Sequence, residues 1–224
     1  AIVGAGIIGS SWALVFARAG WEVRVFARHA EVRKSLHERV RQAAAAARPI
    51  APDVAPSEIL SRIEASVSLD DALQGAEWVQ ESAEEDVEVK AALFADLDRR
   101  AGAEAILASS TSSIGASRFA EQLPGRGRVL VAHPATPPHL IPVVEMVPAP
   151  FTSEAAVAQA GVERTQAEAD LKRQQALQAK GFVSPQTVET AATRLNAAKA
   201  AVTTAEAAVG VARAQIKVQQ VNLD

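Results

Sequence analysis

The sequence predicts an α/β domain with a doubly wound parallel sheet over residues 1–152, followed by an all-α antiparallel coiled-coil hairpin over residues 153–224. The first observation is that short β-branched runs alternate with helical patterns before residue 152, as expected for βαβ units. The second is that all three Trp and five of the six Phe lie in this first part. The third is an apolar residue at every seventh position near the carboxyl end, which favours a long helix paired with another.

The first part contains six segments with the composition of strands and three longer segments with the period of helices. Strands are expected at Ala1–Val3, Trp21–Phe26, Ile63–Val67, Trp78–Glu81, Ala105–Ser109 and Arg128–Ala132. Helices are expected at Ile7–Gly20, Glu31–Ala47 and Val87–Arg100. Because strands alternate with helices, we expect the strands to run parallel in one sheet with helices on both faces.

The second part is expected to form a helix over about 153–179, a turn over 180–184 and a helix over 185–223. Its apolar heptad positions are Val188, Leu195, Val202, Val209, Ile216 and Leu223, and the small residues between them are Ala191, Ala198, Ala205 and Ala212. Gly181 is placed to end the first helix, and Ser184 and Pro185 are placed to begin the second. These signals together predict a helical hairpin.

The composition excludes several classes of function. The formal net charge is −3, which gives no electrostatic reason to expect nucleic acid as a partner. The absence of cysteine excludes disulfides, thiol catalysis and thiolate metal sites. No run of apolar residues is long enough for a membrane span, and no basic leader or cleavage site precedes Gly4, so we expect no signal peptide in this chain.

A glycine motif follows the first expected strand and opens the first expected helix. Gly4, Gly6 and Gly9, with Ile7 and Ile8 between the last two, form a G-x-G-x-x-G. In this context the first glycine permits a tight turn, the second allows close approach of a pyrophosphate, and the third allows the helix to pack on the strand. The motif predicts a Rossmann-type domain that binds a dinucleotide, and a purely structural glycine turn is the alternative.

The end of the second expected strand indicates which dinucleotide is bound. An NAD enzyme usually has an acidic residue here to accept hydrogen bonds from the adenosine ribose. This chain has Ala27 followed by Arg28, a cation that could pair with the 2′-phosphate of NADP. The cofactor is therefore expected to be NAD or NADP. The alternative for Arg28 is a side chain directed to solvent, with NAD bound less well.

Three more segments, together with the glycine motif, resemble one enzyme family. They are Ala108-Ser109-Ser110-Thr111-Ser112-Ser113, Val131-Ala132-His133-Pro134 and the run from Leu140 to Val147. With the Ser-Trp-Ala that follows the glycines, they resemble the 3-hydroxyacyl-CoA dehydrogenases, and most of all the lambda-crystallin (L-gulonate 3-dehydrogenase) branch. The resemblance covers nearly all of residues 1–152. It implies an NAD(P)-dependent oxidoreductase that acts on a 3-hydroxy acid or an acyl-CoA ester.

The resemblance implies a role for five residues. His133 matches the catalytic histidine, Glu145 the glutamate paired with it, and Ser112 the serine that bonds the substrate oxygen, while Glu85 and Lys90 match positions near the cofactor. These residue types suit the chemistry, because oxidation of a secondary alcohol needs a base that works near neutral pH. A carboxylate beside an imidazole fixes its tautomer. Without the resemblance, His133 could equally be a core histidine at a strand end.

Two departures from the family pattern limit the expected activity. Thr136 stands where the branch has Asn, which puts the local order of that loop in doubt. The helical second domain of the family, which supplies a substrate-contacting Asn, has no counterpart in residues 153–224, and we interpret the Gly181-Phe182 match to its first residues as chance. We therefore expect dinucleotide binding with little or no turnover.

The predicted hairpin resembles another family. Arg173, Leu177 and Ser184 have the spacing of the hairpin tip of periplasmic adaptor (membrane fusion, HlyD-like) proteins, in which the tip docks on an outer-membrane channel. The resemblance covers about residues 155–224, and a generic coiled coil that self-associates is the alternative. A dehydrogenase half is expected in the cytoplasm and such a hairpin in the periplasm. The joint near 153–162 therefore looks like a fusion.

Overall fold

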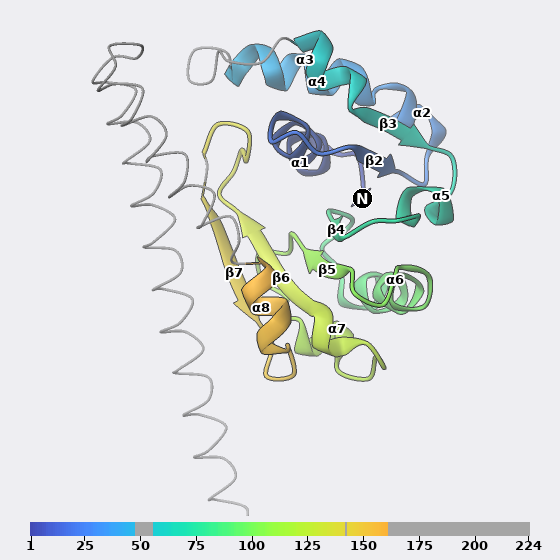
Figure 1. The fold of residues 1–224 in the computed structure, drawn as a ribbon, viewed down its shortest axis with the longest axis vertical. Helices are drawn as coiled ribbons and strands as arrows, with labels where there is room; N and C mark the ends of the chain where they lie inside the picture. The colour runs from blue at the N-terminus through green and yellow to red at the C-terminus, as the bar shows by residue number, and fades with distance from the viewer. Residues whose placement is uncertain (48–55, 142, 161–224) are drawn as a thin grey trace, which may run out of the picture.

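The computed structural model describes residues 1–47, 56–141 and 143–160 (Figure 1). The predicted hairpin lies outside the described residues except for its first turns at 153–160. The proposed tip residues Arg173, Leu177 and Ser184, and all of the heptad positions, therefore lie outside them as well.

The described strands form one seven-stranded sheet with the order β3-β2-β1-β4-β5-β6-β7. The strands are β1 (Ile2–Val3), β2 (Val23–Phe26), β3 (Ile63–Ser66), β4 (Trp78–Glu81), β5 (Ile106–Ser109), β6 (Val129–Pro134) and β7 (Val144–Pro148). The first six strands pair in parallel, as predicted, and their order reverses between β1 and β4. This reversal is the point at which open α/β sheets bind ligands, outside the carboxyl ends of the strands.

Helices cover both faces of the sheet (Figure 1). They are α1 (Ile7–Arg18), α2 (Ala30–Lys34), α3 (Leu36–Ala47), α4 (Pro56–Ser61), α5 (Leu69–Leu73), α6 (Val87–Arg100), α7 (Ser117–Ala120), the 3-10 helix η1 (Arg126–Arg128) and α8 (Glu154–Ala160). Helices α1, α3 and α4 pack on one face with β1, β2 and β3, and α5, α6 and α7 pack on the other. The described residues therefore form the α/β Rossmann-like architecture that the sequence predicts.

The period-2 alternation of the central strands explains this layering. In β5, Leu107 faces the core under α6, while Ile106 and Ala108 face the opposite side. In β6, Val131 and Leu130 divide between the two faces in the same way. Strands buried on both sides need apolar residues at nearly every position, which is how β5 and β6 read.

The last strand, β7, runs antiparallel to β6, whereas the sequence analysis predicted only parallel strands. The chain between them, residues 135–143, is too short for a parallel crossover. The predicted helix Glu31–Ala47 is also divided, because α2 ends before Ser35 and α3 begins after it. The Ser35 hydroxyl donates to the carbonyl of Val32 at this break.

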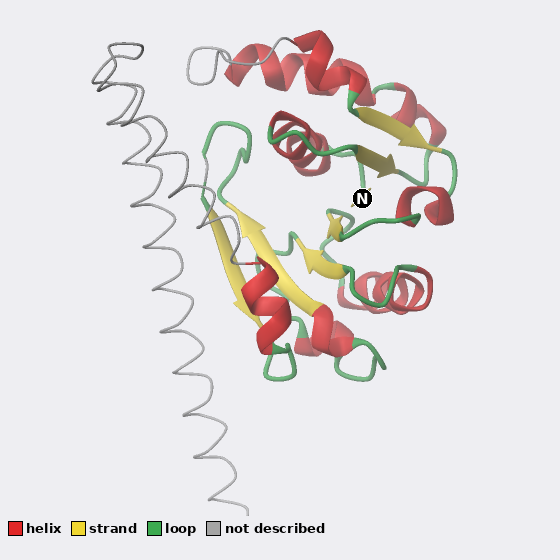
Figure 2. Cartoon of the chain, in the orientation of Figure 1, coloured by secondary structure: helices red, strands yellow, loops and turns green. Residues whose placement is uncertain are grey.

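Helix α8 lies at the start of the segment predicted to be the hairpin, and it packs on the sheet across β5 and β6 (Figure 2). Its Ala156 and Ala160 are buried against Ile106, Leu130 and Ala132. Small side chains let the helix approach the strands closely. The boundary at residue 152 stays a prediction. None of the helices in the described ranges is long and apolar enough to cross a membrane.

Candidate active site

The turn between β1 and α1 has the backbone that the glycine motif predicts. Gly4 has a φ of +105°, and a Cβ on it would lie 2.4 Å from the carbonyl oxygen of Ser82. A Cβ on Gly9 would lie 1.8 Å from the carbonyl oxygen of Gly4, because helix α1 begins directly against the turn. Both positions therefore require glycine for reasons of space, and Gly4 also for its backbone conformation.

Gly6 differs from these two glycines, since a Cβ on it would meet nothing within 4 Å. It is the N-cap of α1, and no side chain caps the helix there. The N–H groups of the first turn, which includes Ile7 and Ile8, therefore adjoin open space beside Gly6. Such a helix start binds anions through its N–H groups and its dipole, so this turn fits a pyrophosphate.

The end of β2 carries cationic side chains and no acid. Ala27 is buried, and Arg28 is exposed with no side-chain partner among the described residues. Arg33 donates to the carbonyls of both residues, at 3.1 Å for Arg28, and so holds this short segment in place. Arg33 was not singled out from the sequence, because only the fold brings α2 back onto the strand end.

Three neighbouring strands carry a polar residue at or next to their carboxyl end, on the face that packs against α6 and α7. In β4, β5 and β6 the buried apolar residue is followed two positions later by Glu81, Ser109 and His133. Because strand side chains alternate, each of these points to the same face as the apolar residue before it. Glu81 pairs in register with Ser109, and the Ser109 hydroxyl donates to the Glu81 carboxylate.

His133 and Glu145 lie directly opposite each other on the antiparallel strands β6 and β7. The His133 Nδ1 and a Glu145 carboxylate oxygen are 3.7 Å apart, an ion-pair distance when the imidazole is protonated. Both side chains are partly exposed, at 32% and 51%. The structure thus brings together two residues that the sequence analysis selected by motif.

Ser112 lies in the loop after β5, where Glu85 anchors it. One Glu85 oxygen, Oε1, accepts hydrogen bonds from the Thr111 hydroxyl at 2.5 Å, from the Ser112 amide at 3.0 Å and from the Ser113 amide at 3.2 Å. Ser112 is exposed, and its hydroxyl is 3.5 Å from the same oxygen. Glu85 therefore fixes the backbone that carries Ser112.

The surroundings of Glu85 keep its carboxyl ionised. Burial raises the pKa of this carboxyl, but the hydrogen bonds from Thr111, Ser113 and Ser112 and the charge of Lys90 lower it to about 2. A carboxylate held by several N–H and O–H donors strongly favours its charged form. Glu85 is therefore an anion throughout the physiological pH range.

Lys90 points inward from α6 and is only 1% exposed. Its Nζ lies 2.9 and 3.0 Å from the two carboxylate oxygens of the fully buried Glu81, and 3.4 Å from Oε2 of Glu85. Sequence analysis assigned Lys90 to the neighbourhood of the cofactor but gave no sign of this pairing. The partner, Glu81, looked like the last residue of an ordinary strand.

A second polar network, which sequence analysis missed, joins α1 to the strand ends. The Ser110 hydroxyl accepts from Trp12 Nε1 at 3.1 Å and from Gln80 Nε2 at 2.8 Å, and it lies 2.9 Å from the Ser82 hydroxyl. The serine run after β5 was the only available signal. The network fixes helix α1 relative to β4 and β5.

The loop between β6 and β7 also contacts helix α1. His139 Nδ1 lies 2.9 Å from the Ser11 hydroxyl, which itself donates to the carbonyl of Ile7. Burial and the positive charge of Arg18 lower the pKa of His139. His139 thus joins the loop between β6 and β7 to helix α1.

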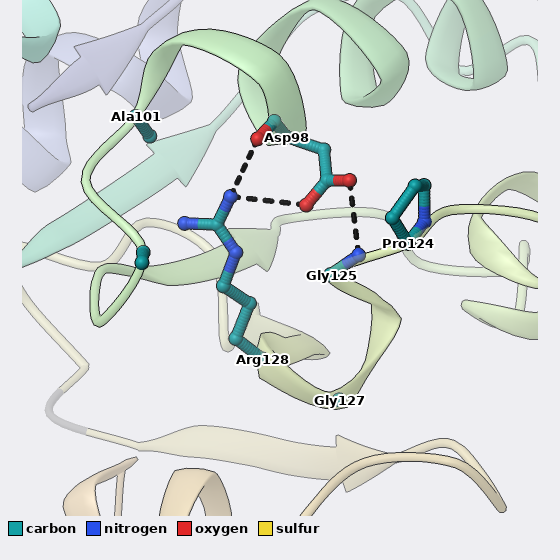
Figure 3. Close-up of a pocket in the computed structure, with 7 residues that line it drawn as sticks. Asp98, Ala101, Pro124, Gly125, Gly127 and Arg128 are labelled. Atoms are coloured by element: carbon teal, nitrogen blue, oxygen red, sulfur yellow. Dashed lines mark hydrogen bonds and ion pairs between the residues drawn. The ribbon is translucent and has the colours of Figure 1, made fainter.

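A hollow of about 470 Å³ lies at the opposite edge of the sheet, at the amino ends of β5 and β6 (Figure 3). Arg128 donates to the backbone and carboxylate of Asp98, at 2.8 and 3.0 Å, and to the carbonyls of Gly102 and Ala105. Asp98 in turn accepts from the amide of Gly125 at 3.0 Å. These polar groups form their hydrogen bonds with one another. We therefore interpret them as a structural contact that joins α6 to the start of β6, and not as a ligand site.

The glycine turn at the switch point and the histidine–glutamate pair at the carboxyl edge define a class of protein, an NAD(P)-dependent oxidoreductase domain. Comparison with known families specifies the class further. The family model described as "3-hydroxyacyl-CoA dehydrogenase, NAD binding domain" matches residues 1–168. The chain belongs to this family.

Two kinds of curated relative illustrate the match. L-carnitine dehydrogenase/betainyl-CoA thioesterase of Rhizobium sp is 34% identical over 166 residues, which are 73% of this chain and 33% of that protein. The lambda-crystallin homolog of Bos taurus is 37% identical over 161 residues, which are 70% of this chain and 50% of that protein. The chain therefore spans a third to a half of the length of these relatives.

Solved structures agree in fold. FadB2 of M. tuberculosis matches with a TM-score of 0.66 at 35% identity, covering 71% of this chain and 56% of that chain. The 3-hydroxybutyryl-CoA dehydrogenase of Escherichia coli matches with a TM-score of 0.64 at 28% identity, covering 70% of this chain and 34% of that chain.

A second family model overlaps the end of the first. It is described as "RND MFP, alpha-helical hairpin domain" and matches residues 150–220, most of which lie outside the described residues. This match covers less than a third of the chain, so it carries less weight than the dehydrogenase match.

Proposed function

We propose that residues 1–152 are the dinucleotide-binding half of a dehydrogenase that oxidises a 3-hydroxy acid or its CoA ester. The observation that carries this proposal is the direct cross-strand pairing of His133 with Glu145, at the sheet edge where the glycine turn lies. A base of this kind is what alcohol oxidation requires.

In the proposed reaction, His133 accepts the proton of the substrate hydroxyl. Because Nδ1 faces Glu145, Nε2 is the nitrogen left for that proton. The Glu145 carboxylate orients the ring and stabilises the imidazolium that forms. The Ser112 hydroxyl donates a hydrogen bond to the substrate oxygen. A bound oxidised dinucleotide would accept the hydride from the substrate carbon that carries this hydroxyl.

The residues around the turn fit the dinucleotide. Gly6 adjoins open space in which the pyrophosphate would lie, and the N–H groups of Ile7 and Ile8 would bind it, while the close packing at Gly4 and Gly9 shapes the turn. The adenosine ribose would lie near Ala27 and Arg28, and Glu85 and Lys90 would lie near the cofactor, as the family resemblance implies. These assignments are proposals for mutagenesis.

Titration of the purified chain with NADH and with NADPH, following energy transfer from the three Trp residues to the nicotinamide, tests the proposal. We expect a saturable signal with at least one of the two nucleotides. If neither gives one, the chain is not a dinucleotide-binding domain.

We propose a second function for residues 153–224, as a foreign helical hairpin fused to the dehydrogenase half. The match of residues 150–220 to the adaptor hairpin supports it. Arg173, Leu177 and Ser184 would form the tip that docks on an outer-membrane channel, and a coiled coil that self-associates is the alternative. Arg173→Asp should weaken binding of the chain to a cognate channel. Equal binding by variant and parent would exclude this role for the tip.

A further inference from the structure

Lys90 and Glu81 form an ion pair that is removed from solvent almost completely. Lys90 is 1% exposed and Glu81 0%, and they face each other from α6 and β4. A buried pair of this kind is expensive to desolvate, and a well-packed apolar pair of similar volume is often as stable. Stability alone therefore does not explain why this position holds a lysine.

The ammonium group of Lys90 donates hydrogen bonds to both carboxylate oxygens of Glu81, Oε1 at 2.9 Å and Oε2 at 3.0 Å. It also forms an ion pair with Oε2 of Glu85, at 3.4 Å. Glu81 is fixed in turn, because it accepts from the Ser109 hydroxyl and, at 2.6 Å, from the amide of Ala83. A dinucleotide phosphate would have to displace a buried carboxylate to reach Nζ.

The third contact of Lys90 leads to the substrate side of the site. Glu85 uses Oε2 for Lys90 and Oε1 for the hydroxyl of Thr111 and the amides of Ser112 and Ser113. Glu85 is 41% exposed, and without Lys90 its Oε2 oxygen would lose its ion pair, leaving the carboxylate held through Oε1 alone. An apolar pair in place of Lys90 and Glu81 could fill the space but could not hold this carboxylate.

We propose that Lys90 is a positioning residue that acts through Glu85 to fix the loop carrying Ser112. The functional meaning of a fixed Ser112 rests on the proposed dehydrogenase activity. The mechanical claim, that Lys90 holds Glu85 and Glu85 holds the two serine amides, does not depend on it.

Amide hydrogen exchange of the ligand-free chain, measured residue by residue by NMR, tests the proposal. The variant Lys90→Met combined with Glu81→Gln removes both buried charges, so that no unpaired ion is left to unfold the protein. We expect exchange at the Ser112 and Ser113 amides to become at least about tenfold faster, because each amide loses a charge-assisted hydrogen bond. The far-UV circular dichroism spectrum should stay unchanged. Lys34→Met is the matched control, because it breaks an exposed ion pair between Lys34 and Glu31, and it should leave exchange at both amides unchanged.

Two further measurements separate positioning from a general loss of structure. Glu85→Ala should speed exchange at the same two amides, and adding it to the double variant should give no further increase. The Ser112 and Ser113 amide shifts report the ionisation of Glu85, and its pKa of about 2 should rise when the lysine charge is removed. A uniform rise in exchange across the domain would indicate simple destabilisation and overturn the proposal.

The opposite assignment has its own signature. If Lys90 binds the cofactor, the double variant should lose NADH and NADPH affinity while exchange at Ser112 and Ser113 stays as in the parent, and the proposal is then wrong. Exchange is measured without nucleotide, so its result does not depend on dinucleotide binding. If the chain binds no dinucleotide, the proposed function is wrong, but the exchange data still test whether Lys90 positions the loop.

Discussion

Arg28 is an exposed guanidinium at the end of β2, beside the buried Ala27 that replaces the usual ribose-binding acid. Ala27 has no side-chain acceptor for the ribose hydroxyls, whereas Arg28 can pair with a 2′-phosphate in a contact worth about 1.5–3 kcal/mol. We predict that NADPH binds at least as tightly as NADH, and that Arg28→Ala weakens NADPH about tenfold or more without weakening NADH. Paired titrations would measure this, with Arg41→Ala as an exposed-arginine control. NADH binding tenfold tighter than NADPH would reject the prediction.

Glu85 connects the acid–base behaviour of the site to the stability of the domain. Its pKa is lowered from the ordinary 4.5 to about 2. A carboxyl whose folded pKa is depressed contributes stability above its unfolded pKa, and this contribution is lost as the pH falls through the folded value. We therefore predict that part of the decline in melting temperature between pH 4.5 and pH 2 disappears in Glu85→Gln. Parallel melting curves of variant and parent across this window would contradict the prediction.

At the scale of elements, the turn between β1 and α1 separates a folding requirement from a binding requirement. A Cβ at Gly9 would collide with the backbone of Gly4, whereas a Cβ at Gly6 meets open space. Gly9→Ala should therefore destabilise the domain by about 1–3 kcal/mol or more. Gly6→Ala should fold normally and lose dinucleotide affinity, because the methyl group would occupy the pyrophosphate position. Thermal melts and nucleotide titrations of both variants would check this contrast, which equal melting temperatures would contradict.

The elements with strong local signals were predicted well from the sequence. Strand β4 and helix α6 have the predicted bounds, since their apolar periods are uninterrupted. Strand β7 was missed because it is half-exposed, holds Glu145 and ends at Pro148, so it shows no clean alternation. Among site residues, the motif identified Glu85 and Lys90. Their partners could not be predicted, because the contact of Lys90 with Glu81 depends on how α6 packs against β4.

At the scale of the whole molecule, the chain spans a third to a half of the length of its curated relatives. Hydride transfer needs the substrate held against the nicotinamide, and such positioning can lower the barrier by about 7–11 kcal/mol. His133 and Glu145 are both partly exposed, at 32% and 51%. We predict that the chain binds a dinucleotide but oxidises 3-hydroxyacyl-CoA, L-gulonate and related acids poorly or not at all.

Steady-state assays of the purified chain against these substrates measure that activity. A turnover in the ordinary enzyme range, about 1–10³ per second, would show that residues 153–224 complete the site after all. His133→Ala serves as the control, since it should remove any residual activity and leave nucleotide affinity intact.

The antiparallel pairing of β6 with β7 also determines how this site can vary in evolution. His133 and Glu145 are opposed by strand register, so residues can be inserted into or deleted from loop 135–143 without separating them. A slip of one residue in β7, by contrast, would turn the carboxylate to the other face of the sheet. Distant homologues that keep the pair should therefore differ in the number of residues between histidine and glutamate. A search for them should look for an acidic residue directly opposite the histidine in the β6–β7 hairpin, and should not require a fixed number of residues between the two.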